Sequence, residues 1–167
     1  LSKEQSKAAI TEPAGKFGVS YTDAAIDRII TVTKGYPFFI QQLCQVVFRE
    51  SNKDVIDAED VDSSIEEFLR VLDEGFFKSR YERCAPSDKN FIFAMVRCGE
   101  LPCTISNVAK NLKKNVNSIS TTRAQLISKG IIYPVRYKEL DFTVPDFSGF
   151  IQRLDEYKQW KIETDLT

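Results

Sequence analysis

The chain has 167 residues, of which 43% are hydrophobic and 28% are charged, and its formal net charge at pH 7 is −1. This composition excludes a disordered chain and a membrane-spanning one, so we expect a cytoplasmic protein with one moderate core or two small ones and no membrane partner. The chain contains no histidine, which excludes Ser-His-Asp and Cys-His catalysis and any zinc site that uses imidazole.

The four cysteines are too widely spaced to form a Cys-x-x-Cys pair. Only Cys98 and Cys103 are close in sequence, and the other two are Cys44 and Cys84. We therefore expect reduced thiols packed in the core of a cytoplasmic protein, and no metal. The alternative is a metal site built from all four thiolates. The chain begins with Leu1 and lacks a basic-then-apolar leader, so we expect it to be part of a longer protein.

The charge differs along the chain. Residues 1–84 carry 11 Lys/Arg against 15 Asp/Glu, residues 85–153 carry 10 against 5, and residues 154–167 carry 2 against 4. This asymmetry indicates two modules. The second has a modest surplus of positive charge, which would suit an anionic partner. We predict a first domain over residues 1–84, a second over residues 85–154 and a C-terminal helical extension over residues 155–167.

The first half has helical periodicity throughout. Ser20 or Thr22 is expected to cap a helix that ends at Gly35, where a glycine accepts positive φ. Pro37 then suits the first turn of the next helix, because a missing N–H costs nothing there. Asp57 is expected to cap a long helix running to about residue 83. The aromatic residues are assigned to the core by their spacing: Phe38, Phe39, Phe48, Phe68, Phe76 and Phe77.

The second half contains three short predicted helices followed by two strands. Ser87, Thr104 or Ser106, and Asn115 are their expected caps. The strand-like stretches IIYPVRY and LDFTVP are separated by the tight Lys138-Glu139 connection, which predicts a β-hairpin, and a closing helix begins near residue 147. The overall prediction is a mainly α chain, in which helix-helix-helix-hairpin order indicates a winged helix-turn-helix domain with a small β-hairpin wing.

Four segments together resemble a known family: TKGYPFFIQQ, LDEGFFKSRYERCAPSDKNFIFAM, RAQLISKGIIY and LDFTVPDFSGFIQR. In order and spacing they resemble the C-terminal part of prokaryotic AAA-type ATPases related to origin-recognition and STAND proteins. The resemblance covers most of the chain. It implies a helical lid subdomain, a winged-helix domain and a missing N-terminal ATPase domain that would bind ATP with magnesium.

The resemblance also concerns one turn. Gly35, Tyr36 and Pro37 match the Gly-x-Pro motif that STAND-type lids place near the adenine, which implies a nucleotide-binding role. The alternative is a helix-turn-helix corner that requires only these residue types. No G-x-x-x-x-G-K-[ST] motif occurs in the chain, so we expect no catalytic residue and no ATP hydrolysis by this chain alone.

The third predicted helix of the second domain is the candidate recognition helix. Several polar side chains fall away from its apolar stripe of Val116, Ile119, Leu126 and Ile127, and two cations lie on the wing. The candidate DNA-binding residues are Asn117, Ser118, Thr121, Gln125, Lys129, Arg136 and Lys138. Lys110, Lys113 and Lys114 flank the same turn. Winged helices also dock proteins or neighbouring subunits, so double-stranded DNA and a protein partner both remain open.

Overall fold

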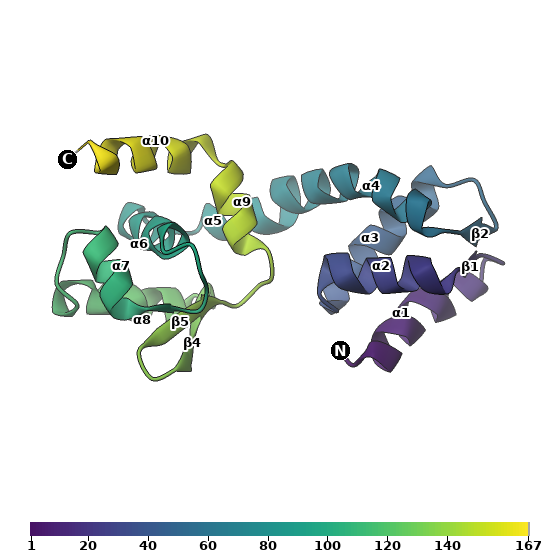
Figure 1. Cartoon of the computed structure of the whole chain (residues 1–167), viewed down its shortest axis with the longest axis horizontal. Coiled ribbons are helices and arrows are strands. Elements are labelled where there is room, and N and C mark those ends of the chain that lie inside the picture. The colour runs from purple at the N-terminus through teal and green to yellow at the C-terminus, as the bar shows by residue number, and fades with distance from the viewer. Residues whose placement is uncertain (167) are drawn as a thin grey trace. The chain divides into compact units, whose positions relative to one another are not determined.

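The computed structural model describes residues 1–166, and the chain forms two compact units, Leu1–Glu74 and a second unit that begins at Gly75 (Figure 1). Helices dominate both units, and the sheets are small, which confirms the mainly α prediction. Within residues 1–166, no helix combines the length and the apolar character needed to cross a bilayer.

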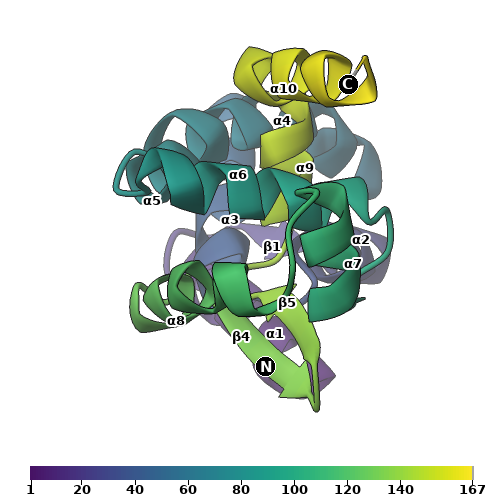
Figure 2. The same ribbon diagram turned by 90° about the vertical axis from the view of Figure 1, so that its left-hand side faces the viewer.

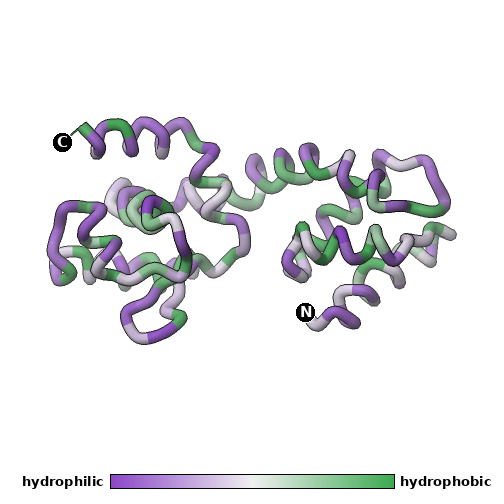
Figure 3. Tube along the Cα trace, in the orientation of Figure 1, coloured by the Kyte–Doolittle hydropathy of each residue, from purple (hydrophilic) through white to green (hydrophobic). Residues whose placement is uncertain are grey.

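The first unit consists of four helices and a two-stranded parallel sheet. β1 pairs with β2 through Ser20 opposite Val55 and Tyr21 opposite Ile56. Figure 3 shows that polar and apolar residues take opposite sides along the coil of α4. In chain order the elements are α1 (Lys3–Gly15), β1 (Ser20–Tyr21), α2 (Asp23–Thr33), α3 (Pro37–Glu50), β2 (Val55–Ile56) and α4 (Ala58–Val71).

Local chemistry explains the helix ends of the first unit. The Thr22 hydroxyl accepts the Ala25 N–H at the start of α2, and the Asp57 carboxylate accepts the N–H groups of Glu59 and Asp60 at the start of α4. These side chains accept hydrogen bonds from N–H groups that have no partner within the helix. Asp57 is therefore confirmed as the cap of α4, and Thr22 rather than Ser20 is the cap of α2. Ser20 lies in β1 instead.

Buried apolar residues of the four helices form the core of the first unit. From α3 it includes Phe39, Leu43, Val46 and Val47, which recur at helical spacing. The assignment of all six aromatics to the core was wrong for two of them, because Phe38 and Phe48 are exposed. Phe38 lies in the first turn of α3 and Phe48 near its end, and helical periodicity alone does not separate a core residue from an apolar surface residue at these positions.

The second unit begins within a π-helical segment and continues through six more helices, one 3₁₀ turn and a three-stranded sheet. Figure 2 shows α6 between α10 and α8, with the β4–β5 hairpin projecting on the side of α8. Its elements are η1 (Leu72–Phe77, shared with the first unit), α5 (Lys78–Tyr81), α6 (Pro86–Arg97), β3 (Cys103–Thr104), α7 (Ile105–Asn111), η2 (Asn117–Ile119), α8 (Ser120–Ser128), β4 (Ile132–Arg136), β5 (Glu139–Phe142), α9 (Phe147–Arg153) and α10 (Asp155–Asp165).

Two of the expected caps of the second unit are present. The Thr104 hydroxyl accepts the Asn107 N–H, and Asn115 Oδ1 accepts the Ser118 N–H at 2.8 Å. The expected Ser87 cap was wrong, because Ala85 is the cap residue and α6 begins at Pro86, two residues earlier than a Ser87 cap implies; the carboxylate of Asp88 accepts the Ala85 N–H at 2.9 Å. Proline at the first helical position moved the start of this helix.

The sheet has one strand more than the sequence predicted. β5 lies between β3 and β4 and is antiparallel to both. β3 contributes only Cys103 and Thr104, which pair with Leu140 and Glu139. The expected hairpin is confirmed as β4 and β5. The expected Lys138-Glu139 connection was one residue too late, because Glu139 is already paired in β5 and the strands are joined by Tyr137 and Lys138, the latter at φ +64.

Aromatic rings fill the core of the second unit. Phe77 packs on Phe147 and Phe150, with ring centroids 5.9 and 5.4 Å away. Tyr81 packs against Phe150 and donates a hydrogen bond to Glu156 Oε2 at 2.6 Å. Residues 75–84 therefore belong with the second compact unit, ten residues before the boundary expected from the sequence.

The closing helix is divided in two. Leu154 adopts an extended backbone between α9 and α10, so α10 starts in a new direction. Trp160 of α10 packs against Phe93 of α6 and Tyr157, with ring centroids 5.6 and 6.2 Å away. The Arg97 guanidinium lies 5.8 Å from the centre of the Trp160 ring. These contacts hold α10 on α6.

Candidate functional site

The outward face of η2 and α8 carries four of the predicted site residues. Asn117, Ser118, Thr121 and Gln125 are all exposed, whereas Ile119 and Leu126 of the same segment are buried. The Asn115 side chain caps this segment, and the Ser118 hydroxyl donates to the Asn115 carbonyl at 2.8 Å. The face is therefore polar and held in place by its own caps.

The apolar stripe of this segment is shorter than predicted. Val116 was expected in the core but is 40% exposed, because the chain enters α8 through a 3₁₀ turn that shifts the helical phase. Arg123 is half-buried, and its Nε is buried. Arg123 therefore packs toward the interior and does not join the outward face.

Lysines border the start of this face. Lys110 is exposed in the last turn of α7, and exposed Lys113 and Lys114 follow the helix. Lys113 takes a left-handed φ of +53, which turns the chain, and its N–H donates to the Lys110 carbonyl at 3.0 Å. The Lys113 ammonium lies 3.5 Å from the Thr164 carbonyl of α10. Positive charge is thus concentrated where the chain turns toward η2.

A polar groove of about 340 Å³ opens beside these lysines. It brings Lys113, Lys114 and Ser118 together with Asn90 of α6 and Trp160 of α10. The sequence predicted the lysines and Ser118 at one site, but not the participation of α6 and α10, which are distant in sequence.

The wing carries the two predicted cations, Arg136 and Lys138, and both are exposed. Tyr137 stands between them with 87% of its surface exposed, and the Lys138 ammonium lies 5.0 Å from its ring centroid. Tyr133 and Val135 of β4 are also exposed. The wing is therefore cationic at its tip and apolar along its edge strand.

Lys129 is engaged within the unit. Its ammonium forms an ion pair with the carboxylate of Asp88, which is 0% exposed, and lies 3.4 Å from the Arg83 carbonyl. Hydrogen bonding to Asp88 raises the pKa of Lys129. We therefore do not count Lys129 among the residues available to DNA.

The predicted nucleotide-binding turn lies in the first unit, between α2 and α3. Gly35 has φ +67 and is buried, Tyr36 is half-buried, and Pro37 is exposed at the first position of α3. The Tyr36 ring packs edge-on to Phe39 with centroids 4.8 Å apart. α2 ends at Thr33 with Lys34 as its left-handed cap, so the helix stops two residues before Gly35.

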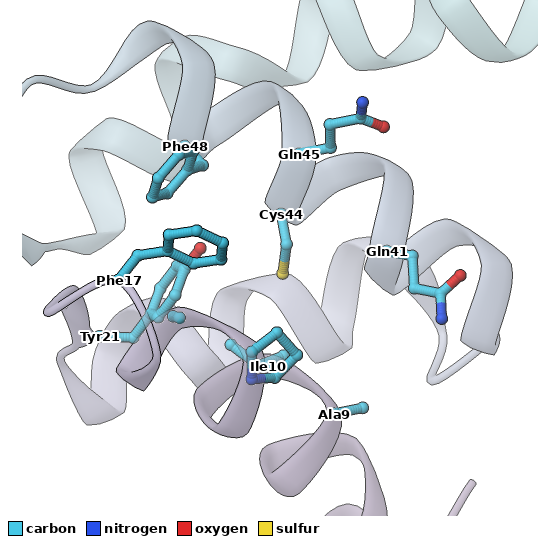
Figure 4. Close-up of a pocket in the computed structure, with 10 residues that line it drawn as sticks. Ala9, Ile10, Phe17, Tyr21, Gln41, Cys44, Gln45 and Phe48 are labelled. Atoms are coloured by element: carbon cyan, nitrogen blue, oxygen red, sulfur yellow. The ribbon is translucent and has the colours of Figure 1, made fainter.

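A second groove of about 320 Å³ lies between α1 and α3 (Figure 4). Phe17 and Phe48, which are 73% and 45% exposed, form one end with ring centroids 5.7 Å apart. Tyr21 and Cys44 also line this groove. Burial raises the pKa of Cys44 to about 11.

Sequence reasoning missed this groove. Phe17 lies in the loop after α1 and Phe48 near the end of α3, so no single periodic pattern contains both. Exposed aromatic rings that meet across two elements are recognised only once the helices are placed.

No cluster of three or more His, Cys, Asp or Glu side chains that could hold a metal ion occurs within residues 1–166. A family of domains of unknown function, DUF8462, matches residues 74–151, which corresponds to most of the second unit. No curated protein matches the chain.

Proposed function

We propose that the second unit is a winged helix-turn-helix domain that binds double-stranded DNA. The order α6, β3, α7, α8, β4, β5 and the strand order β3-β5-β4 support this assignment, because a helix-turn-helix followed by a hairpin wing has this arrangement. The observation that carries the proposal is the exposed polar face of η2 and α8, which is bordered by lysines at one end.

The side chains of this face match the chemistry of DNA. Asn117 and Gln125 carry amides, which pair with adenine edges in the major groove, and Ser118 and Thr121 carry hydroxyls that bond bases or phosphates. Arg136 and Lys138 on the wing would contact the flanking phosphates. Residues 85–153 carry 10 Lys/Arg against 5 Asp/Glu, and this excess of positive charge would attract the DNA phosphates.

For the first unit we propose the lid of an AAA-type ATPase whose nucleotide-binding domain lies outside this chain. The exposed ring of Pro37 and the half-buried ring of Tyr36 fit an apolar face for an adenine base. Nothing at this turn replaces a phosphate-binding loop, so the missing domain would hold the phosphates of ATP and the magnesium. The lid contributes contact with the base and closes over it.

Coupling between the two units would follow the chain. α4, η1 and α5 succeed one another from Ala58 to Tyr81 without an intervening loop. In this proposal, the nucleotide bound by the intact protein alters DNA binding by the second unit through that helical segment.

A second function is favoured by the apolar edge of the wing. Tyr133, Val135 and Tyr137 are exposed on or beside β4, the outer strand of the sheet. An edge strand with exposed apolar side chains suits docking of a protein or a neighbouring subunit. In this alternative the domain binds no DNA.

Titration of the chain with labelled duplex DNA at about 50 and about 200 mM salt separates the two functions. A DNA-binding domain gives saturable anisotropy that weakens steeply with salt, because binding releases counterions. Absence of binding at the lower salt concentration overturns the DNA proposal and leaves the docking function. The lid proposal is tested separately in the intact protein, where Pro37→Ala is expected to weaken ATP binding and unchanged affinity contradicts the adenine role.

A further inference from the structure

The polar groove of the second unit is built from segments that are far apart in the sequence. α6 contributes Asn90 and Phe91, the turn after α7 contributes Lys113 and Lys114, and α10 contributes Trp160. Its volume of about 340 Å³ lies near the lower end of the range of about 300–1,000 Å³ that small-molecule pockets occupy. Spaces between packed helices are a common place for such pockets. The groove therefore has the size for one small molecule.

The charge of the groove favours an anion. Lys113 and Lys114 line it, and no Asp or Glu within residues 1–166 does so. The Lys113 ammonium lies 3.5 Å from the Thr164 carbonyl, which places positive charge against the wall formed by α10. The Lys114 ammonium is exposed and has no ion-pair partner in the part of the chain that the structure describes. A phosphate monoester carries about −1.5 to −2 charges near pH 7, so two ammonium groups match its charge.

Uncharged polar groups supply hydrogen-bonding capacity. Ser87 and Asn90 of α6 and Thr122 of α8 line the groove, and within residues 1–166 the side chains of these three have no hydrogen-bond partner. Asn111, by contrast, is used by the fold, because its Nδ2 donates to the Ala94 carbonyl at 2.9 Å. Hydroxyl and amide groups both donate and accept, so the three side chains suit the hydroxyls of a sugar and the polar edge of a base.

An apolar wall completes the groove. Trp160 is half-buried, and its ring is held by Phe93 and Tyr157, with ring centroids 5.6 and 6.2 Å away. Phe91 and Ile119, both buried, lie beside the same space. A rigid aromatic and aliphatic wall next to polar groups is the usual setting for a ligand with a flat ring.

The groove is separate from most of the proposed DNA-reading face. Of the four outward residues of that face, Ser118 lines the groove, whereas Asn117, Thr121 and Gln125 do not. The walls from α6 and α10 likewise contribute nothing to the face. A ligand in the groove therefore has its own set of contacts.

We propose that the polar groove binds a small phosphate monoester that carries a ring, namely a free 5′-mononucleotide. The two lysines hold the phosphate, the three unpartnered polar side chains bond the sugar and the base edge, and the apolar wall around Trp160 contacts the base. This inference goes beyond the DNA and lid proposals and rests on neither of them, because it concerns contacts within the second unit.

The test is isothermal titration calorimetry of the whole chain, without DNA, against each of the four ribonucleoside 5′-monophosphates. The parent nucleosides and inorganic phosphate are titrated in parallel, because each lacks one part of the ligand. We expect at least one monophosphate to bind saturably, and at least about tenfold more tightly than its nucleoside or inorganic phosphate. Binding of none of the four, or equally tight binding of inorganic phosphate, overturns the proposal.

A pair of lysine variants separates contact in the groove from general attraction. Lys114→Gln removes a cation of the groove and is expected to weaken nucleotide binding about tenfold. Lys110→Gln removes the same charge from the last turn of α7, which is exposed and does not line the groove, and should change the affinity by less than about twofold. Equal losses would show attraction by overall charge and contradict a defined site.

Nuclear magnetic resonance of the unaltered ¹⁵N-labelled chain locates the ligand without any substitution, so the proposal remains testable even if a variant fails to fold. The backbone amides of Lys114, Ser118 and Thr122 are expected to shift as the nucleotide is added. Those of Gly35 and Tyr36, at the proposed adenine contact of the lid, are expected to stay in place. Shifts at Gly35 and Tyr36 with none in the groove would place the nucleotide in the first unit and overturn the proposal.

Discussion

The ammonium of Lys129, at the C-terminal end of α8, is paired with the carboxylate of Asp88 in the first turn of α6, and that carboxylate is 0% exposed. Asp88 Oδ2 also accepts the Ala85 N–H, whereas Asp88 Oδ1 is buried without a protein partner. One carboxylate therefore caps α6 and holds the end of α8. This pair joins the first and third helices of the proposed winged-helix domain.

Removing either partner is expected to destabilise the second unit. Asp88→Ala loses the hydrogen bond to Ala85 and is expected to cost about 1–3 kcal/mol. Lys129→Met leaves a buried carboxylate without its cation and is expected to lower the unfolding midpoint clearly. The double variant should cost less than the sum of the two. Urea unfolding followed by circular dichroism measures this, with Lys158→Met on the exposed face of α10 as the control. Equal, additive effects would contradict a coupled pair.

Gly35→Ala is expected to destabilise the first unit by about 1–2 kcal/mol, because φ is +67 there and L residues disfavour this region. Space is not the cause, since an added Cβ would lie 3.5 Å from Ser6 Oγ, an ordinary contact. Gly15→Ala is the matched control: it ends α1, and nothing lies within 4 Å of its added Cβ. Thermal unfolding should separate the two variants, and equal losses would show that backbone conformation is not responsible.

If the second unit binds DNA as proposed, replacing Arg136 and Lys138 together by Ala is expected to weaken binding to every DNA sequence. The proposed loss of two phosphate contacts should flatten the slope of log affinity against log salt by about two units. Anisotropy titrations at several salt concentrations measure the slope. The double variant Lys158→Ala with Lys161→Ala removes the same charge from α10 and should change the slope much less. A larger effect from α10 would move the interface away from the wing.

Replacing Asn117 or Gln125 by Ala is expected to act on sequence preference. If their amides read base edges, each substitution should cost about 1–3 kcal/mol on a preferred site and little on others. Competition between a selected and a scrambled duplex measures the difference. Ser128, which is exposed at the C-terminal end of α8, provides a control position. Equal weakening on both duplexes would assign these residues to the phosphate backbone.

Alkylation of Cys44 by iodoacetamide is expected to be slow near neutral pH and to rise until the pH reaches about 11, because its pKa is raised to about 11 and only the thiolate reacts. Cys98, whose pKa is lowered, should react at lower pH. The hydrogen bond from Tyr21 lowers the pKa of Cys44 against the effect of burial. Tyr21→Phe should therefore slow the labelling of Cys44 further, and mass spectrometry of the separate peptides measures both rates. Faster labelling of Cys44 in Tyr21→Phe would show instead that Tyr21 shields the Cys44 thiol from iodoacetamide.

Features that depend on neighbouring residues in the chain could be predicted from the sequence. The caps Asp57 and Thr104 and the positive φ of Gly35 follow from local hydrogen bonding and backbone sterics, and the structure confirms them. The outward placement of Asn117 and Gln125 followed from helical phase, although the 3₁₀ turn left Val116 outside the core.

Features that depend on distant residues could not be predicted. Lys129 is exposed by helical phase, and only the packing of α8 on α6 brings it to Asp88, 41 residues earlier. β3 is only two residues long, so its sequence shows no alternation of polar and apolar residues that would predict a strand. It forms because it pairs with β5. The contact of Phe17 with Phe48 likewise requires the placement of α1 against α3.

Trp160 is the single tryptophan of the chain, and it stands on α10 among Phe93, Tyr157 and Arg97. Intrinsic fluorescence excited at the indole therefore reports the junction of α6 and α10 and carries no signal from an indole in the first unit. The same ring lines the polar groove that contains Lys113 and Lys114. An anion or nucleic acid that enters this groove meets a fluorophore at its wall, so the chain carries its own optical probe for that event.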